Sequence, residues 1–232
     1  MIVHAKADGV EFLRAVTLFS DLSPEEMAKI EALAKPDFYQ QGETLFEEGD
    51  DGQYFYMIET GMVKLVRHAG DKERILTLLF AGDNFGELSL IDGEKRSATA
   101  ITLEDSQFQI INRLQFLDLL AENPMIAFKV MSQLCHRLRN MLQRVDDFMS
   151  IGAGNRLLRS IMSLASEHGD DVAGEICLNL HMSVDELGKM NGMSEKLTHT
   201  SLNQLENRGL IRIEGQIICV KTEAINELLK GS

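Results

Sequence analysis

The stretch FGELSLIDGEKRSATA, residues 85–100, is the most distinctive part of this chain. It begins with an aromatic residue, a glycine and a glutamate, and it ends with an arginine, a serine and small residues. Glu87 and Arg96 stand nine positions apart, with a short acidic turn between them. A carboxylate and a guanidinium, each beside small residues, are more typical of a binding site than of a core.

Short β-prone runs flank this stretch, and glycines or acidic clusters separate them. Runs this short and this regularly interrupted predict an antiparallel sandwich or jelly roll. The expected strands are residues 38–39, 44–46, 54–58, 62–66, 75–80, 98–103 and 108–111. Ahead of them, Ser23 and Pro24 precede two glutamates, which predicts the capped start of a helix.

The chain changes to a helical period after residue 112. Asn123 and Pro124 open a stretch that we expect to be helical to about residue 149. Its apolar residues alternate in spacings of four and three, as in the seam of a two-stranded coil. The seam residues are Ala127, Met131, Leu134, Leu138, Met141, Val145 and Phe148. The period predicts a parallel homodimer through helix 124–149, and an ordinary core helix is the alternative.

The last third of the chain begins after SIGAG, residues 150–154, whose two glycines predict a hinge. A helix over 156–167 and a strand over 176–180 are expected next. Ser183 with Glu186 forms a capping box, and Asn191-Gly192 is typical of a turn.

A second helix then follows, capped by Ser194 and closed by Gly209. Its expected buried stripe is Leu197, Ser201, Leu202 and Leu205. Strands over 211–213 and 217–220 complete a helix–turn–helix with a hairpin, which predicts a winged helix-turn-helix. A small helical domain without a nucleic-acid role is the alternative.

Composition limits the class of protein. The 232 residues are 44% hydrophobic and 25% charged, as in a soluble globular protein, and the formal net charge is −13. A net charge this negative argues against a protein whose whole surface binds nucleic acid. We expect no membrane span and no signal peptide. The distant cysteines, without metal-like spacing, predict reduced thiols in a cytoplasm. They are Cys135, Cys177 and Cys219.

The order of these parts resembles the Crp/Fnr family of bacterial transcription regulators, from about Leu18 to about Glu227. The resemblance rests on Phe85-Gly86-Glu87-Leu88 and Arg96-Ser97-Ala98, followed by a long helix and a winged helix. Structural glycines of the family match Gly42, Gly49 and Gly61. The resemblance implies an α+β protein in three parts. These are a β-jelly-roll cyclic-nucleotide-binding domain (1–123), a dimerisation helix with hinge (124–151) and a winged helix-turn-helix DNA-binding domain (152–232).

The resemblance also implies roles within the stretch 85–100. In the family, the glutamate accepts from the ribose 2′-hydroxyl and the arginine pairs with the cyclic phosphate, which a planar guanidinium suits. Glu87 would thus hold ribose, and Arg96 and Ser97 would hold phosphate. Backbone groups would come from Gly86, Leu88 and Ala98. Cyclic AMP is the first expectation; cyclic GMP or an empty site are the alternatives, and cyclic di-GMP is disfavoured.

The chain departs from the family at the base-binding positions. Met141 and Leu142 replace adjacent hydroxyl residues that contact the adenine, and neither side chain donates a hydrogen bond. Met141 can still pack on a purine, and Arg137 matches a family arginine close to the base. Base selection is therefore expected to differ from that of typical relatives.

The second departure is in the recognition helix, where Glu195, Lys196 and Thr200 stand where relatives carry arginines and a glutamate. The bidentate guanine-reading arginine is absent. From residue 152 onward, 8 Lys and Arg face 11 Asp and Glu, a balance of −3. The expected DNA-side residues are Lys189, Ser194, Glu195, Lys196, His199, Thr200 and Arg208.

Other functions fit less well. An iron–sulfur sensor needs a cysteine cluster near the N-terminus, and a haem sensor needs axial ligands, for which only isolated histidines such as His4 and His68 are present. Neither a metal-ligand cluster nor a nucleophile–base set is visible, so an enzyme is not expected. The expected function is a ligand-responsive homodimer that binds an inverted repeat of double-stranded DNA, with RNA polymerase as a further candidate partner. The alternative is a nucleotide-binding signalling protein whose acidic winged helix docks to protein.

Overall fold

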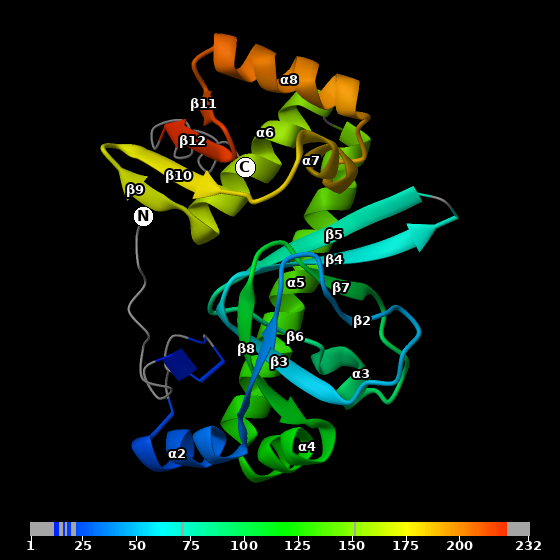
Figure 1. Ribbon diagram of the computed structural model, residues 1–232, viewed down its shortest axis with the longest axis vertical. Coiled ribbons are helices and arrows are strands. Elements are labelled where there is room, and N and C mark those ends of the chain that lie inside the picture. The colour runs from blue at the N-terminus through cyan, green and yellow to red at the C-terminus, as the bar shows by residue number, and fades with distance from the viewer. Residues whose placement is uncertain are drawn as a thin grey trace. The chain divides into compact units, whose positions relative to one another are not determined.

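The computed structural model describes residues 12, 13, 16, 18, 19, 22–70, 72–150 and 152–221, with backbone alone at 69, 72 and 144–150. The chain divides into an N-terminal unit, residues 1–68 and 76–139, and a C-terminal unit, residues 140–232 together with the short segment 69–75 (Figure 1). In chain order the elements are α2 (Pro24–Leu33), β1 (Lys35–Tyr39), β2 (Thr44–Phe46), β3 (Tyr54–Thr60), β4 (Met62–Ala69), β5 (Lys72–Phe80), β6 (Asn84–Phe85), α3 (Glu87–Ile91), β7 (Thr99–Thr102), β8 (Ser106–Asn112), α4 (Arg113–Glu122), α5 (Pro124–Ser150), α6 (Ala153–His168), β9 (Asp170–Val172), β10 (Glu175–Asn179), α7 (Val184–Met190), α8 (Glu195–Asn207), β11 (Ile211–Glu214) and β12 (Ile217–Lys221).

Two four-stranded sheets form the N-terminal unit, in the orders β1-β8-β3-β6 and β2-β7-β4-β5. Strand β8 pairs antiparallel with β1 and β3, β3 with β6, and β7 with β2 and β4, so the predicted β-rich fold is confirmed. Gly42, Gly49 and Gly61 have positive φ, as turns between such strands require. Tyr56 and Phe85 stack in the core with ring centroids 5.1 Å apart. The expected strands are present, whereas β6, α3 and α4 were not predicted.

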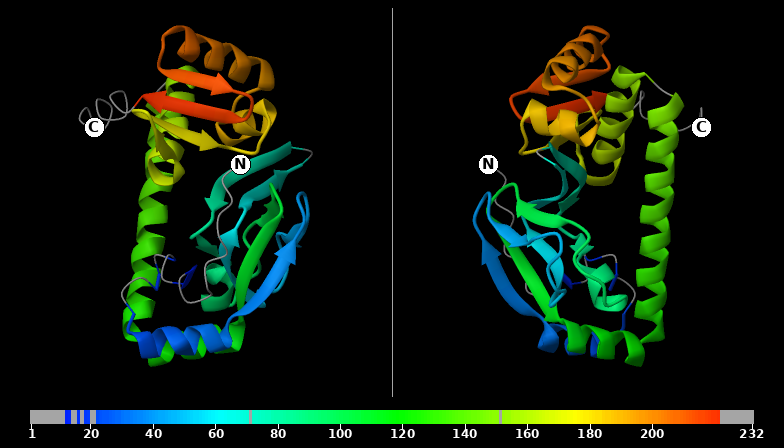
Figure 2. Two further views of the ribbon diagram at one scale, coloured as in Figure 1. Left: turned by 60° about the vertical axis from the view of Figure 1, so that its left-hand side comes forward. Right: turned by 90° about the vertical axis from the view of Figure 1, so that its right-hand side faces the viewer.

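A second apolar cluster joins α2, α4 and the start of α5 to β3, and Figure 2 shows these helices together. Phe55 of β3 stacks on Phe116 of α4 at 4.5 Å between centroids. Ser23 caps α2 as predicted, and with Glu26 it forms a capping box that holds the first turn. Ser23 Oγ accepts from the Glu26 N–H at 3.3 Å, and a Glu26 oxygen accepts from the Ser23 N–H at 2.8 Å.

The predicted long helix is present as α5, which has 27 residues. One face of α5 belongs to the core, because Ile126 and Val130 are buried in the cluster with α2 and α4. On the predicted seam, Met131, Leu138 and Met141 expose more than half of their side chains. The seam side chains of Val145 and Phe148 lie outside the described residues, as do His4 and Ile151. None of the described helices has the length and hydropathy needed to cross a membrane.

The C-terminal unit combines α6, α7 and α8 with a sheet in the order β11-β12-β10-β9. Helix α6 buries one apolar side, which includes Leu157 and Ile161. The predicted hairpin is β11 with β12, and Gly209 takes the expected positive φ of 68° before it. The winged helix-turn-helix is thus confirmed, with β9 as an additional strand.

The prediction of reduced thiols is wrong for two of the three cysteines. Cys177 of β10 and Cys219 of β12 form a disulfide, and Cys135 is free and exposed. The two positions are 42 residues apart in sequence, but antiparallel pairing places them directly opposite each other. Spacing along the chain carries no information about this register, which explains the error.

Candidate functional site

The stretch 85–100, together with Asn84 just before it, forms a compact turn structure, called here the cassette. Strand β6 leads into Gly86, whose φ of 83° starts α3 at Glu87. A Cβ at Gly86 would lie 2.8 Å from Arg96 Nη1 and 3.2 Å from the Tyr54 carbonyl oxygen. Glycine is therefore required both for the backbone turn and for the close approach of Arg96.

Arg96 is held inside the cassette, with 4% of its surface exposed. Its Nη1 donates to the Gly86 carbonyl at 2.7 Å and to Ser89 Oγ at 3.0 Å, and its Nη2 donates to the Tyr54 carbonyl at 2.7 Å. The guanidinium lies 4.1 Å from the centroid of the Phe46 ring. Burial lowers the pKa of Arg96. Its remaining donor, Nε, has no partner among the described residues.

Glu87 is the second buried charge, with 2% of its surface exposed. Its Oε1 accepts from Arg137 Nη1 at 2.8 Å, while its Oε2 has no partner among the described residues. Arg137 also donates to the Asn84 carbonyl oxygen, and Gln133 donates to Asn84 Oδ1 at 2.9 Å. Helix α5 is thereby tied to the cassette by two side chains one turn apart.

The cassette therefore contains buried polar atoms that the described part of the chain does not satisfy. They are Asn84 Nδ2, Glu87 Oε2 and Arg96 Nε. Buried polar atoms normally have hydrogen-bond partners, because an unpaired one costs about 1–3 kcal/mol. A free acceptor on the carboxylate and a free donor on the guanidinium are complementary to a ligand that carries both a hydroxyl group and an anionic oxygen.

The other expected ligand residues differ in how far they are exposed. Ala98 is buried, whereas Ser97 is exposed and Leu88 has 45% of its surface exposed. Met141 and Leu142 follow Arg137 by about one turn of α5 and are exposed, at 62% and 57%. The residues that sequence reasoning missed are Asn84, Ser89 and Gln133. Gln133 had a detectable signal, because it precedes Arg137 by four positions on one helix face.

A cavity of about 350 Å³ borders Arg96 on another side. Tyr54, Tyr56 and Phe46 line it, together with acidic side chains from the first sheet and the turn before β3. The lining does not include Glu87, Ser97 or Ala98, so this cavity is not the site that the resemblance implies. Its carboxylates also disfavour a phosphate there.

The helix–turn–helix consists of α7 and α8. Ser183 and Glu186 form the predicted capping box, and Ser194 Oγ accepts from the Leu197 N–H at 3.4 Å. The predicted stripe needs one correction, because Leu197 is 44% exposed and Thr198 is fully buried instead. Thr198 Oγ1 donates to the Ser194 carbonyl, which allows a polar residue in this packed position.

The expected DNA-side residues form a partial surface. Glu195, Lys196, His199 and Thr200 are exposed and share one face of α8. Lys189 on α7 pairs with Asp185 at 2.9 Å, and this contact raises the pKa of Lys189. Ser194 and Arg208 are exposed at the two ends of α8. Lys196, in the first turn of α8, is the lysine on this exposed face.

Two family models match the chain. Residues 36–123 match the cyclic nucleotide-binding domain, and residues 155–228 match the Crp-like helix-turn-helix domain. A cyclic AMP receptor protein of Thermus thermophilus is 31% identical over 93% of this chain and 97% of that protein. A CRP-like cAMP-activated global transcriptional regulator of Mycobacterium tuberculosis is 27% identical over 90% of this chain and 94% of that protein.

The fold has close matches among solved structures. FixK2 from Bradyrhizobium japonicum superposes with a TM-score of 0.74 at 21% identity, covering 84% of this chain and 96% of FixK2. The order of the β-rich domain, long helix and helix–turn–helix is thus shared with the FixK2 structure.

Proposed function

This chain belongs to the Crp/Fnr family of transcription regulators, and we propose that it is a homodimer that binds a cyclic nucleotide in the cassette and an inverted DNA repeat through α8. Cyclic AMP is the first ligand to test, since one relative named above is a cyclic AMP receptor protein and the other is a cAMP-activated regulator. Such a regulator acts on DNA in the cytoplasm and performs no chemistry of its own.

The buried pair of Glu87 and Arg96 carries the ligand proposal. The ribose 2′-hydroxyl would donate to Glu87 Oε2, and a phosphate oxygen would accept from Arg96 Nε. Both atoms lack partners among the described residues. Both are buried, so ligand entry requires small shifts of neighbouring side chains. Ser97 is exposed at the end of the cassette and would add its hydroxyl to the phosphate contacts.

Calorimetry tests this assignment with cyclic AMP, cyclic GMP and cyclic di-GMP. Arg96→Ala removes a charge-assisted contact worth ~1.5–3 kcal/mol, so affinity should fall ~10- to 150-fold. Lys95→Ala is the matched control, because Lys95 is exposed and pairs with Asp51 at the surface. If none of these nucleotides binds the parent protein, the cassette does not serve a cyclic nucleotide.

The exposed apolar seam of α5 carries the dimer proposal. Leu138 is 57% exposed in the single chain, so Leu138→Glu should leave the monomer folded while placing charges in the seam of a dimer. Sedimentation equilibrium should then show a parent dimer and a Leu138→Glu monomer. Ser132→Glu, an exposed change off the seam, should stay dimeric. A monomeric parent at micromolar concentration would refute the dimer.

The exposed face of α8 carries the DNA proposal. Glu195 can accept from cytosine N4, and Lys196 can reach a guanine or a phosphate. Selection from random duplexes, with and without nucleotide, should enrich an inverted repeat with half-sites about one helical turn apart. Lys196→Glu should abolish enrichment, and Lys29→Glu on α2 should not.

The negative balance of the C-terminal region favours a second candidate, a winged helix that docks to protein. Absence of any enriched sequence at low salt, with nucleotide saturating, would support that candidate instead. In either case the ligand must bind two arrangements of the chain with different affinity. Arg137 would transmit ligand binding to α5, because its side chain joins this helix to Glu87, the carboxylate proposed to bind the ligand.

A further inference from the structure

The disulfide of the C-terminal unit closes a loop around the whole helix–turn–helix. Cys177 and Cys219 are separated by 42 residues, and the segment between them contains α7, α8 and β11. Cross-linking the ends of such a loop restricts the unfolded chain, and this stabilises the folded form. The disulfide is thus placed to control the stability of the two helices proposed to read DNA.

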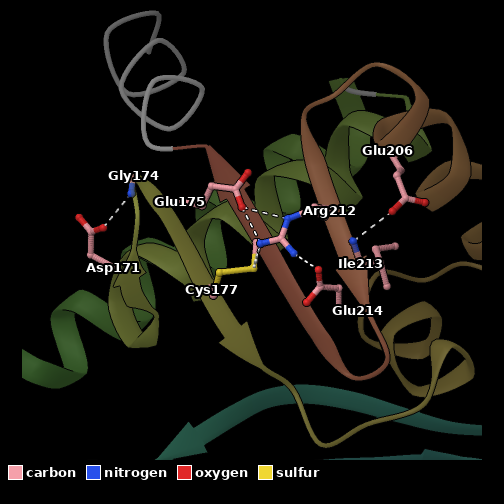
Figure 3. Close-up of polar contacts among 9 residues, drawn as sticks. Asp171, Gly174, Glu175, Cys177, Glu206, Arg212, Ile213 and Glu214 are labelled. Atoms are coloured by element: carbon pink, nitrogen blue, oxygen red, sulfur yellow. Dashed lines mark hydrogen bonds and ion pairs between the residues drawn. A yellow bond between two sulfur atoms is a disulfide. The ribbon is translucent and has the colours of Figure 1, made fainter.

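A guanidinium lies beside this sulfur pair. Arg212, Cys219 and Cys177 occupy one row across β11, β12 and β10, so their side chains share a face of the sheet. Arg212 Nη2 is 3.4 Å from Cys219 Sγ and 2.7 Å from a Glu175 oxygen, and Arg212 Nη1 contacts Glu214. Figure 3 shows Arg212 between the two carboxylates, next to the disulfide.

The two sulfurs differ in access and in surroundings. Cys177 is half-buried, whereas Cys219 is 3% exposed. An incoming thiolate therefore reaches Cys177 more easily. The sulfur that leaves is then Cys219, whose negative charge is stabilised by the guanidinium beside it. This combination of an accessible sulfur and a stabilised leaving group favours thiol–disulfide exchange.

We propose that Cys177 and Cys219 form a reversible redox site that responds to low-molecular-weight thiols such as glutathione. A first thiolate attacks Cys177 Sγ, which breaks the S–S bond and releases Cys219 as a thiolate. A second thiolate attacks the mixed disulfide and releases Cys177. The protein gains two electrons and two protons, and two thiol molecules become one disulfide.

The same residues could also be considered for a metal ion, because ligand atoms of Glu175, Cys177 and Cys219 lie within 4.8 Å of one another. The guanidinium of Arg212 argues against this, since it contacts both Glu175 and Cys219 and would repel a cation. The guanidinium thus takes the place of a cation beside Glu175 and the disulfide.

The redox chemistry is tested on the full chain carrying Cys135→Ser, which removes the exposed free thiol. The protein is equilibrated in mixtures of reduced and oxidised glutathione and alkylated, and the alkyl groups are counted by mass spectrometry. Two thiols should appear together within this range of mixtures. In a time course after reduced glutathione is added, Arg212→Gln should be reduced more slowly, because Cys219 would then leave less readily.

Thermal unfolding gives a second measurement. Reduction should lower the midpoint of the C-terminal unit by at least about 8 °C, as expected for a loop-closing disulfide in a small domain. The triple variant Cys135→Ser/Cys177→Ser/Cys219→Ser should show no response to reductant. A loss of DNA affinity on reduction would follow only if the proposed function holds, whereas thiol counts and unfolding do not depend on it.

Three results would overturn the proposal. The pair could fail to oxidise in the most oxidising mixture, which would make it a packed dithiol. It could stay oxidised in the most reducing mixture, which would make it a structural cross-link. The reduced protein could retain one added Zn²⁺ that protects both thiols from alkylation, which would make the cluster a metal site.

Discussion

Breaking the ion pair between Glu87 and Arg137 should strongly destabilise the N-terminal unit. Glu87 is 2% exposed, and Arg137 Nη1 is the donor to its carboxylate at 2.8 Å. Arg137→Met would leave this carboxylate buried without its hydrogen-bonded cation. Breaking a buried pair in this way costs about 3–5 kcal/mol. Because 32% of the Arg137 side chain is exposed, solvent screens part of the attraction, and we expect about 2–4 kcal/mol.

Urea denaturation followed by the fluorescence of the tyrosines in β3 provides the measurement. With a typical slope for a domain of this size, the midpoint of Arg137→Met should fall by roughly 1–2 M. Glu87→Gln in the same chain should recover part of the loss, because the buried group is then neutral. Arg139→Met is the matched control, since Arg139 is exposed on the same helix and should change stability by less than ~0.5 kcal/mol. Equal effects of the two arginine substitutions would refute the reasoning.

Three further outcomes are expected. Gly86→Ala should destabilise the N-terminal unit by about 2 kcal/mol in urea, because φ is 83° and the new Cβ would lie 2.8 Å from Arg96 Nη1. Gly188→Ala should destabilise only the C-terminal unit, by about 1–3 kcal/mol, because its Cβ would lie 2.6 Å from a threonine oxygen of α8; an unchanged midpoint would mean that α7 and α8 can separate freely. Hydrogen bonds from Ser23 lower the pKa of Glu26, so this capping box stabilises the fold above the carboxyl's unfolded pKa, and that contribution is lost as pH falls through the folded value. Glu26→Gln, which removes the titrating carboxylate but keeps its shape, should therefore destabilise the protein at pH 7, and the difference from the parent should shrink in melts near pH 3.

Local features of the chain were predictable from sequence because the interactions behind them span only a few residues. The caps at Ser23, Ser183 and Ser194 each join a side chain to a backbone group three positions away. Glycines in the strand-rich part mark turns that need positive φ, and Gly209 does the same at the end of α8. The hydrophobic period of two residues in a strand, and of three and a half residues in the long helix, is likewise a property of a single segment.

The cassette was recognisable for a different reason, because its residues are nearly contiguous in sequence. The carboxylate, the guanidinium and the small residues all lie within residues 85–100. Their chemical types were therefore visible together, and the family followed from them. The sequence did not show which of their atoms lack hydrogen-bond partners. Arg96 donates to Gly86, to Ser89 and to Tyr54, which is distant in sequence.

Tertiary structure alone decided the contacts between segments far apart in the chain. The sequence by itself indicated most of the helices and strands, and that Arg137 lies on the long helix. Only the fold brought Arg137 to Glu87, 50 positions away, and Cys177 to Cys219, 42 positions away. Such pairs depend on strand register and on which helix face meets the sheet. Both are set by the burial of apolar side chains across the whole unit. No local pattern in the sequence therefore predicts them.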